Sequence, residues 1–336
     1  MVLAGDPGAA APLLLVGHLD TVLPAAPLRR GEDRLVATGA IDMKGGLAAL
    51  CGALDLLAAE GRPLPAGLRL VAVPDEEVGG PISHRAVRRF GAAARALWVL
   101  EPGSPRPEGA ESLVVGRRGL QPFSLQVEGR SAHAGADFWE GRSALTAAAR
   151  WVAAAAALSR PGRGPIVNPA RLVAAEAAAV ADPARLAGIL GTARLLNVVP
   201  DRARVDGEAR FFREEERRDL TEELGALAAR VAAEGQVRCE LSLGEPVPAL
   251  EPTPSRLAYG ARAAAAAAAR AWRLELEEDR GGISFPNFLP PGSGIPVLDG
   301  LGPVGGGMHT RDEHVLIGSL RRRIRLLADL LAAESA

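Results

Sequence analysis

Histidine and carboxylate side chains that could hold metal ions recur in this sequence just after apolar runs. The first pair, His18 and Asp20, follows the unbroken apolar residues 13–16, with Gly17 between the run and the histidine. If the chain stays extended past Gly17, the two side chains point to the same side. An imidazole beside a carboxylate is typical of a metal ligand whose second ring nitrogen is held by an acid. The alternative is a polar strand end that only caps a sheet.

Acidic residues follow two further apolar runs. Residues 68–73 precede the three acids at 75–77, and residues 97–100 directly precede Glu101. Adjacent carboxylates repel one another unless a cation or solvent screens them, so a solvated acidic turn is the alternative interpretation.

Asp42 lies in the glycine-rich residues 38–46, which lead into a segment with apolar residues at helical spacing that ends at Gly61. Glycines let the backbone come close to a bound ion. The Walker spacing of glycines, Lys and Ser/Thr is missing, so the loop does not indicate phosphate binding. A solvated loop aspartate is the alternative.

A fourth apolar run, residues 295–298, ends at Asp299, and His309 follows the glycine-rich stretch after it. Apolar runs of this kind are typical of parallel strands buried on both faces. Open α/β sheets bind their ligands beyond the carboxyl ends of such strands. Recurring strand-end ligands therefore predict a metal site at one edge of a mostly parallel sheet.

Composition narrows the class of protein. The 336 residues carry 39 basic and 40 acidic side chains, a formal net charge of −1, which does not favour nucleic acid or an anionic membrane as partner. Cys51 and Cys239 lack CxxC spacing, so neither a disulfide framework nor a zinc ribbon is indicated. No apolar run is long enough to span a bilayer, and Asp6 with no basic region argues against a signal peptide. We expect a cytoplasmic protein.

These motifs resemble those of the M20 metallopeptidases and amidohydrolases, a family that includes glutamate carboxypeptidase, acetylornithine deacetylase and succinyl-diaminopimelate desuccinylase. The resemblance covers most of the chain. The matching stretches occur in family order and read GHLDTV, TGAIDMKGG, PDEEVGG, LEPGS, EGRSAHAG, LNVVPDRARVDGEARF and LDGLGPVGGGMHTRDEHV.

The resemblance implies two zinc ions per chain, with Co²⁺ or Mn²⁺ as substitutes. Asp42 would bridge the ions. His18 and Glu101 would complete the ligands of one ion, and Glu77 and His309 those of the other. Carboxylates and imidazoles suit Zn²⁺ with an open position for water.

The resemblance also implies that Asp20 orients His18 and that Glu76 is the general base. Two nearby ions lower the pKa of bound water and polarise the scissile carbonyl. A free carboxylate such as Glu76 would then carry the proton to the leaving amine.

The middle of the chain has a different pattern. It alternates strand-like and helical segments in the order βαββαβ, which suggests an inserted ferredoxin-like α+β unit. The segments are residues 120–127, 143–158, 171–174, 202–212, 214–233 and 237–243. In the family this unit is a lid that also dimerises. We therefore expect a lid and dimerisation domain at 117–245, and a discontinuous catalytic domain at 1–116 and 246–336.

Three lid residues match family positions with further roles. His133 resembles the histidine that reaches the partner subunit's active site and stabilises the oxyanion. Asn197 and Arg210 match positions that hold the substrate's carboxylate, for which a guanidinium fork is well shaped. The alternatives are a turn histidine and a surface arginine. His84 and His314 match no ligand position and are expected to be structural or solvated.

Two departures from the family pattern bear on the site. Relatives usually begin with a further helical segment and strand before the first histidine motif, so the start is expected to be either truncated or misassigned, and in that case the sheet to lack a strand. Many relatives also have an Asp where this chain has Phe285, in a loop stiffened by Pro286. The second departure puts the loop and the adjoining substrate pocket in question, and leaves the metal ligands intact.

The sequence thus predicts a dinuclear zinc hydrolase, a homodimer, that cleaves an amide or peptide bond next to a free carboxylate, as glutamate carboxypeptidase does. One alternative is an N-acyl amino acid deacylase acting on a small N-acyl substrate. An alternative of another class is a non-catalytic metal-binding relative, against which the intact Glu76 speaks. The acyl group and the amino acid are left open.

Overall fold

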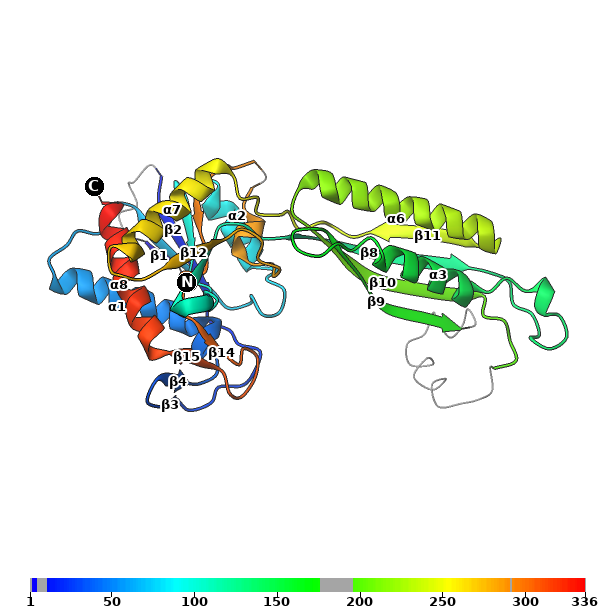
Figure 1. Cartoon of the computed structure of the whole chain (residues 1–336), viewed down its shortest axis with the longest axis horizontal. Coiled ribbons are helices and arrows are strands. Elements are labelled where there is room, and N and C mark those ends of the chain that lie inside the picture. The colour runs from blue at the N-terminus through cyan, green and yellow to red at the C-terminus, as the bar shows by residue number, and fades with distance from the viewer. Residues whose placement is uncertain (1, 5–10, 176–195, 291, 336) are drawn as a thin grey trace. The chain divides into compact units, whose positions relative to one another are not determined.

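The computed structural model describes residues 2–4, 11–175, 196–290 and 292–335, and the chain divides into two compact units (Figure 1). Unit 1 consists of Met1–Arg117 and Leu250–Ala336, and unit 2 of Arg118–Ala249. The catalytic and lid roles expected for two such domains stay predictions. None of the helices in the described ranges combines the length and apolar character that a membrane crossing requires.

Unit 1 is built on a five-stranded sheet. In spatial order its strands are β1 (Val2–Ala4), β5 (Leu68–Val73), β2 (Leu13–His18), β6 (Ala96–Val99) and β13 (Val297–Leu298). Only the β1–β5 pair is antiparallel. The first four residues of the central strand β2 are fully buried, as expected for a parallel strand covered on both faces. The predicted fold class, a mostly parallel α/β sheet, is confirmed.

The described residues of unit 1 include four α-helices: α1 (Gly45–Ala59), α2 (Ser83–Gly91), α7 (Pro254–Ala268) and α8 (Ile317–Ala333). α1 follows the glycine-rich loop, as predicted, and the chain leaves the helix at Gly61, whose φ of 62° is unstrained only for glycine. The acidic turn after β5 supplies the start of α2, because the carboxylate of Asp75 accepts the N–H groups of Ile82 and Ser83.

Short strands complete unit 1, and one pairing is important for the site. β15 pairs antiparallel with β4, which places a late segment of the chain beside the entry to the Asp42 loop. These strands are β3 (Arg29–Arg30), β4 (Arg34–Val36), β7 (Glu111–Val114), β12 (Leu274–Glu277), β14 (Gly305–Gly306) and β15 (His314–Leu316). Short helical turns are η1 (Ala40–Lys44), η2 (Pro107–Gly109) and η5 (Phe285–Phe288).

Unit 2 has the predicted ferredoxin-like order of elements. These are β8 (Gly119–Glu128), the turn η3 (Phe138–Glu140), α3 (Ala144–Ala156), β9 (Ile166–Ala175), β10 (Arg202–Phe211), α6 (Glu214–Gly235) and β11 (Arg238–Leu243). The strands form one antiparallel sheet in the order β11-β8-β10-β9.

The two helices in the described part of unit 2, α3 and α6, pack on the same face of its sheet. Trp151 of α3 is fully buried, meets the Phe123 ring of β8 edge-on at 5.5 Å between centroids, and donates its indole N–H to the Leu224 carbonyl of α6. This one side chain therefore joins the sheet and both helices in a single core.

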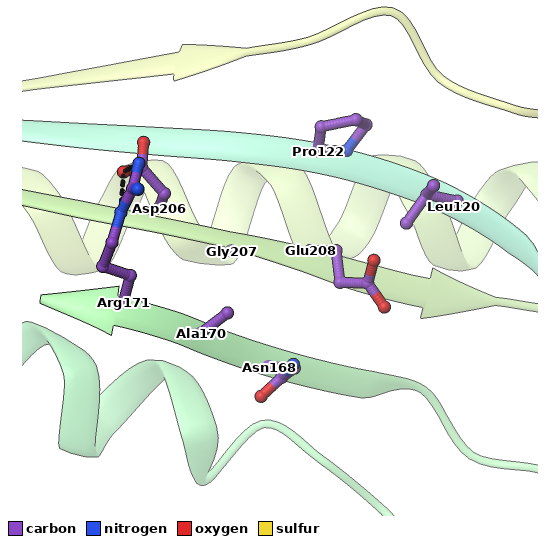
Figure 2. A pocket seen from close by; sticks show the side chains of 8 residues that line it. All are labelled: Leu120, Pro122, Asn168, Ala170, Arg171, Asp206, Gly207 and Glu208. Atoms are coloured by element: carbon purple, nitrogen blue, oxygen red, sulfur yellow. Dashed lines mark hydrogen bonds and ion pairs between the residues drawn. The ribbon is translucent and has the colours of Figure 1, made fainter. Parts of the chain in front are cut away.

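The opposite face of this sheet has a hollow of about 540 Å³ lined by both apolar and polar residues, shown in Figure 2. The residues that line it are Leu120, Pro122, Asn168, Ala170, Arg171, Asp206, Gly207 and Glu208. Arg171 of β9 and Asp206 of β10 form an ion pair, with 2.6 Å between a guanidinium nitrogen and a carboxylate oxygen. None of the predicted site residues is among the eight that line this hollow.

Trp151→Ala should remove ~3–5 kcal/mol from the free energy of unfolding of unit 2, because a large buried side chain is lost and a cavity is left. Urea unfolding followed by circular dichroism measures the change. Trp139→Ala is the matched control, since Trp139 lies in the same unit with 86% of its surface exposed. A loss for Trp151→Ala no larger than that of the control would contradict this description of the core.

Candidate metal centre

The structure brings together all five predicted metal ligands, and they all belong to unit 1. One ligand atom from each of His18, Asp42 and Glu101 lies within 4.8 Å of the others, and the same holds for Asp42, Glu77 and His309. Three ligands come from the carboxyl ends of neighbouring parallel strands, since His18 ends β2, Glu77 follows β5 and Glu101 follows β6. The remaining two come from the loop before α1 and from the turn before β15.

Asp42 is common to the two groups, and its two oxygens face different histidines. Its Oδ1 lies 3.0 Å from Nε2 of His18, and its Oδ2 lies 3.2 Å from Nε2 of His309. Only 8% of the Asp42 surface is exposed. One carboxylate is thus placed to serve two cations at once.

The chemistry of the donors fits two divalent ions. Each group offers one imidazole nitrogen and two carboxylates, a set that suits zinc and leaves room for water or substrate. Glu101 Oε1 is 3.9 Å from His18 Nε2, and Glu77 Oε2 is 3.4 Å from His309 Nε2. The group with Glu101 is buried throughout, whereas the His309 side chain is 48% exposed, so the second group opens to solvent.

Asp20 contacts His18. It also links the two groups through Glu77, and the sequence did not suggest this second contact. The carbonyl oxygen of Asp20 lies 3.1 Å from Nδ1 of His18, and the carboxylate lies 3.4 Å from the same nitrogen. The carbonyl acceptor favours a ring proton on Nδ1, so Nε2 is the nitrogen that would bind a metal. The other carboxylate oxygen accepts the N–H of Glu77 at 2.9 Å.

The crowded charges shift the pKa values of the buried ligands. Burial lowers the pKa of His18, but the hydrogen bond to Asp42 and the nearby carboxylates outweigh it and raise that pKa to about 9. Burial raises the pKa of Glu101 to about 8, aided by the charge of Asp42 and opposed by His18 and Arg117. Bound cations would remove this repulsion between carboxylates.

Glu76 lies beside the site but belongs to neither ligand group. Burial raises the pKa of its carboxyl, and the charges of Asp42 and Asp20 act in the same direction against His18 and Arg117. A carboxylate that is close to the ligands, half-buried and outside both ligand groups suits a proton acceptor.

Asp299, which ends the fourth apolar run, is in neither ligand group. Its buried carboxylate instead pairs with Arg117 and accepts the N–H of Gly300. Arg117 also donates to the Gly282 carbonyl at 3.0 Å. Asp299 thus pairs with an internal arginine and supplies no ligand to either group, so this strand end differs from that of Glu101.

The loop that departs from the family pattern supports Glu101. Ser284 donates its hydroxyl to Glu101 Oε1 at 3.2 Å, and its own N–H is held by Asn287. Phe285 is 1% exposed, and its ring centroid lies 6.3 Å from that of His18. Phe285 thus forms an apolar wall beside the first ligand. The sequence marked this position only as a deviation and gave no sign of the serine contact.

His133 and Asn197 lie together in unit 2. The N–H of Ala134 donates to the Asn197 carbonyl at 2.8 Å, and residues 133 and 198 form a β-bridge. Nδ1 of the exposed His133 accepts the N–H groups of Gly135 and Ala136, each at 3.1 Å. The proton of the neutral ring is therefore on Nε2, so His133 presents a hydrogen-bond donor to its surroundings.

Arg210 lies at the other end of the same sheet. It opposes Leu120 near the start of β8, whereas the segment with His133 follows the end of β8, where Glu128 opposes Arg202. The eight steps along the strand from Arg202 to Arg210 span about 26 Å. Part of the Arg210 guanidinium contacts Glu208 at 2.8 Å. Within unit 2, Arg210 therefore lies at the opposite end of the sheet from His133 and Asn197.

Neither His84 nor His314 is in a ligand group. His84 stacks on Phe288, with 3.2 Å between ring centroids, and Nδ1 of His314 lies 2.9 Å from the Asp312 carbonyl. Their contacts agree with the predicted structural role.

Comparison with known families agrees with this arrangement. The family model described as peptidase family M20/M25/M40 matches residues 14–333. The chain belongs to this family. The predicted membership of a family of hydrolytic enzymes is therefore confirmed.

Curated relatives of this M20 chain include two carboxypeptidases. A probable carboxypeptidase of Aspergillus terreus is 35% identical over 148 residues, which cover 41% of this chain and 32% of that protein. Carboxypeptidase G2 of Pseudomonas sp. is 26% identical over 329 residues, covering 95% of this chain and 73% of the relative. The match thus spans about a third of the length of the first relative and most of the second.

Solved structures show the same fold. Aminopeptidase PepT from Bacillus cereus superposes with a TM-score of 0.78 at 20% identity, covering 100% of this chain and 84% of that one. The YxeP protein of Bacillus subtilis, described as a dinuclear metal binding peptidase of the M20 family, gives a TM-score of 0.67 at 17% identity, with coverage of 99% and 84%. At such identities the likeness establishes the fold alone.

The metal-free protein should lose stability as the pH rises from 6.5 to about 9. The folded-state pKa values of His18 and Glu101, about 9 and about 8, lie above their usual values of 6.5 and 4.5. Each group therefore stabilises the fold fully below its usual pKa, and this contribution is lost as the pH rises through the folded value.

Urea midpoints measured with a chelator across this pH range test the prediction. Glu101→Gln should flatten the decline, whereas the same change at Glu108, whose side chain is 79% exposed, should leave it as in the wild type. A midpoint that rises with pH, or an equal slope in Glu101→Gln, would contradict the assigned pKa shifts.

Proposed function

We propose that this chain is a dinuclear zinc hydrolase that cleaves an amide or peptide bond adjacent to a free carboxylate. The observation that carries the proposal is the sharing of Asp42 between two histidine–carboxylate groups, with Glu76 beside them and outside both. The dinuclear YxeP peptidase and the carboxypeptidase relatives support it by analogy. Co²⁺ or Mn²⁺ are expected to substitute for zinc.

In the proposed reaction, two bound zinc ions would acidify a water molecule and polarise the scissile carbonyl. Glu76 accepts the proton of that water and delivers it to the leaving nitrogen as the C–N bond breaks. Asp20 holds the His18 ring with Nε2 toward Asp42. Phe285 excludes water from one side of the buried group, which strengthens the electrostatic interactions within it.

A carboxypeptidase-like substrate and an N-acyl amino acid share a carboxylate next to the scissile amide. Arg210 and Asn197 are the proposed partners of that carboxylate. A hydrolysis screen with zinc or cobalt, using dipeptides, N-acyl amino acids and the matching amides without the carboxylate, tests the proposal. We expect turnover only when the carboxylate is present. Metal uptake without hydrolysis of any of these would instead favour a non-catalytic metal-binding relative.

Glu76→Gln should lower turnover by ~10² or more while metal content holds, because the substitution keeps the shape and removes the proton acceptor. Steady-state kinetics with elemental analysis of the same sample measure both quantities. Glu77→Gln is the matched variant at the next residue and should lose metal, since Glu77 is a proposed ligand. Metal loss in Glu76→Gln with full occupancy in Glu77→Gln would mean that the two roles are exchanged.

We also propose that the enzyme is a homodimer in which His133 and Asn197 act on the partner's active site. Within one chain, about 26 Å of strand separates their end of the sheet from Arg210, which is more than a small substrate can span. A site that uses all three residues must then take them from two chains. The Nε2–H of His133 is the donor that would stabilise the oxyanion of the tetrahedral intermediate.

Subunit mixing tests this arrangement. Glu76→Gln and His133→Ala should each be nearly inactive, yet random reassortment should restore roughly a quarter of wild-type activity, because half the dimers are mixed and each has one intact site. Glu76→Gln mixed with Arg210→Ala is the control and should stay inactive if Arg210 serves its own chain. If the first mixture stays inactive although mass spectrometry detects heterodimers, His133 does not act in trans.

A further inference from the structure

Glu313 is a buried acid that the proposed reaction does not use. It is 4% exposed and lies in unit 1 directly before β15. It forms no ion pair with any cationic side chain in the described part of the chain, unlike the buried acids Glu111 and Asp299, which pair with arginines. A buried carboxylate needs other partners to offset its loss of hydration.

Those partners are three backbone N–H groups of the Asp42 loop. Gly39 donates to Oε2 of Glu313 at 2.8 Å, and Ile41 and Asp42 both donate to Oε1 at 3.0 Å. The loop residues lie more than 270 positions earlier in the chain. The carboxylate therefore fixes the backbone of the very residue that both ligand groups share.

The main chain holds Glu313 where it can make these bonds. Its carbonyl accepts the N–H of Ala37 at 3.1 Å, which extends the β15–β4 pairing up to the loop. Its own N–H donates to Thr310, at the end of the turn that carries His309. One residue thus connects the segment of His309 to the segment of Asp42.

We propose that Glu313 is a positioning residue that keeps Asp42 and His309 in register for the two metal ions. The effect of Glu313 on metal binding rests on the proposed dinuclear function. Its effect on the order of residues 39–42 rests only on its hydrogen bonds to that loop. Glu313 contacts neither ligand side chain, so it acts through the backbone of one ligand and the turn of the other.

Glu313→Gln tests the proposal because it keeps the size and removes one acceptor. The amide carbonyl can still accept two N–H groups, but its NH₂ meets a third N–H as donor against donor. Zinc titration in competition with a chromophoric chelator should give affinities weaker by ~10–100-fold, the scale for losing a group that supports metal ligands. Hydrogen exchange of residues 39–42 in metal-free protein should become faster.

Glu111→Gln is the matched control. Glu111 is a glutamate of the same unit, 2% exposed, whose carboxylate bonds to Ser319, Arg322 and Arg323 and to none of the ligands. It should lower stability without weakening metal binding or exposing residues 39–42. Glu313→Asp keeps the charge and both oxygens on a shorter stem and should give intermediate affinity. If Glu313→Gln does not fold, Glu313→Asp is the variant on which zinc affinity and hydrogen exchange are measured.

The outcomes separate the positioning role from the proposed function. Unchanged exchange in residues 39–42 of the Glu313 variants overturns the inference, and so does wild-type zinc affinity. If wild-type protein takes up no zinc but exchange in this loop still rises in Glu313→Gln, the dinuclear function fails and the role of Glu313 in ordering the loop stands.

Discussion

The structure of the candidate site depends on one carboxylate placed between two histidines. Asp42 contacts His18 with one oxygen and His309 with the other, and Glu101 and Glu77 lie beyond them. These three acids and two imidazoles come from segments far apart in the sequence. Without cations, the site concentrates negative charge in a poorly hydrated place, which is why the pKa values of Glu101, Glu77 and Glu76 are all raised.

The surrounding structure fixes the ligands with hydrogen bonds and offsets part of this electrostatic cost with one buried arginine. Asp20 accepts from the backbone of Glu77, Ser284 donates to Glu101, and Arg117 brings a buried positive charge near the first group. Each contact limits the movement of a ligand. A site preorganised in this way binds metal without first having to order its own side chains.

The sequence predicted the parallel sheet because its signals are local, and the resemblance to the family implied which residues would be the metal ligands. An apolar run followed by an acid, as in residues 97–101, indicates a strand with a carboxylate at its end. The ferredoxin-like order of unit 2 followed from alternating and helical periodicities, for which short-range spacing is sufficient. The structure and the family match confirm the fold class and the family.

Contacts between distant segments could not be predicted in the same way. Asp299 has the same sequence pattern as Glu101, yet Arg117, 182 positions earlier, occupies its carboxylate. The hydroxyl of Ser284 reaches Glu101 across 183 positions, and Glu313 reaches Asp42 across 271. No periodicity encodes such pairs. The separation of Arg210 from His133 likewise depends on the register of β8 with β10, which one sequence does not specify.

The sharing of Asp42 is most directly tested by elemental analysis of zinc-reconstituted protein in which Asp42 is replaced by alanine. Wild-type protein should hold two zinc ions per chain, and Asp42→Ala should lose both, because each ion loses a ligand and its charge. Glu101→Ala, which removes a ligand from one group only, should retain the other ion. An Asp42→Ala protein that still holds a full ion per chain would contradict the bridging role of Asp42.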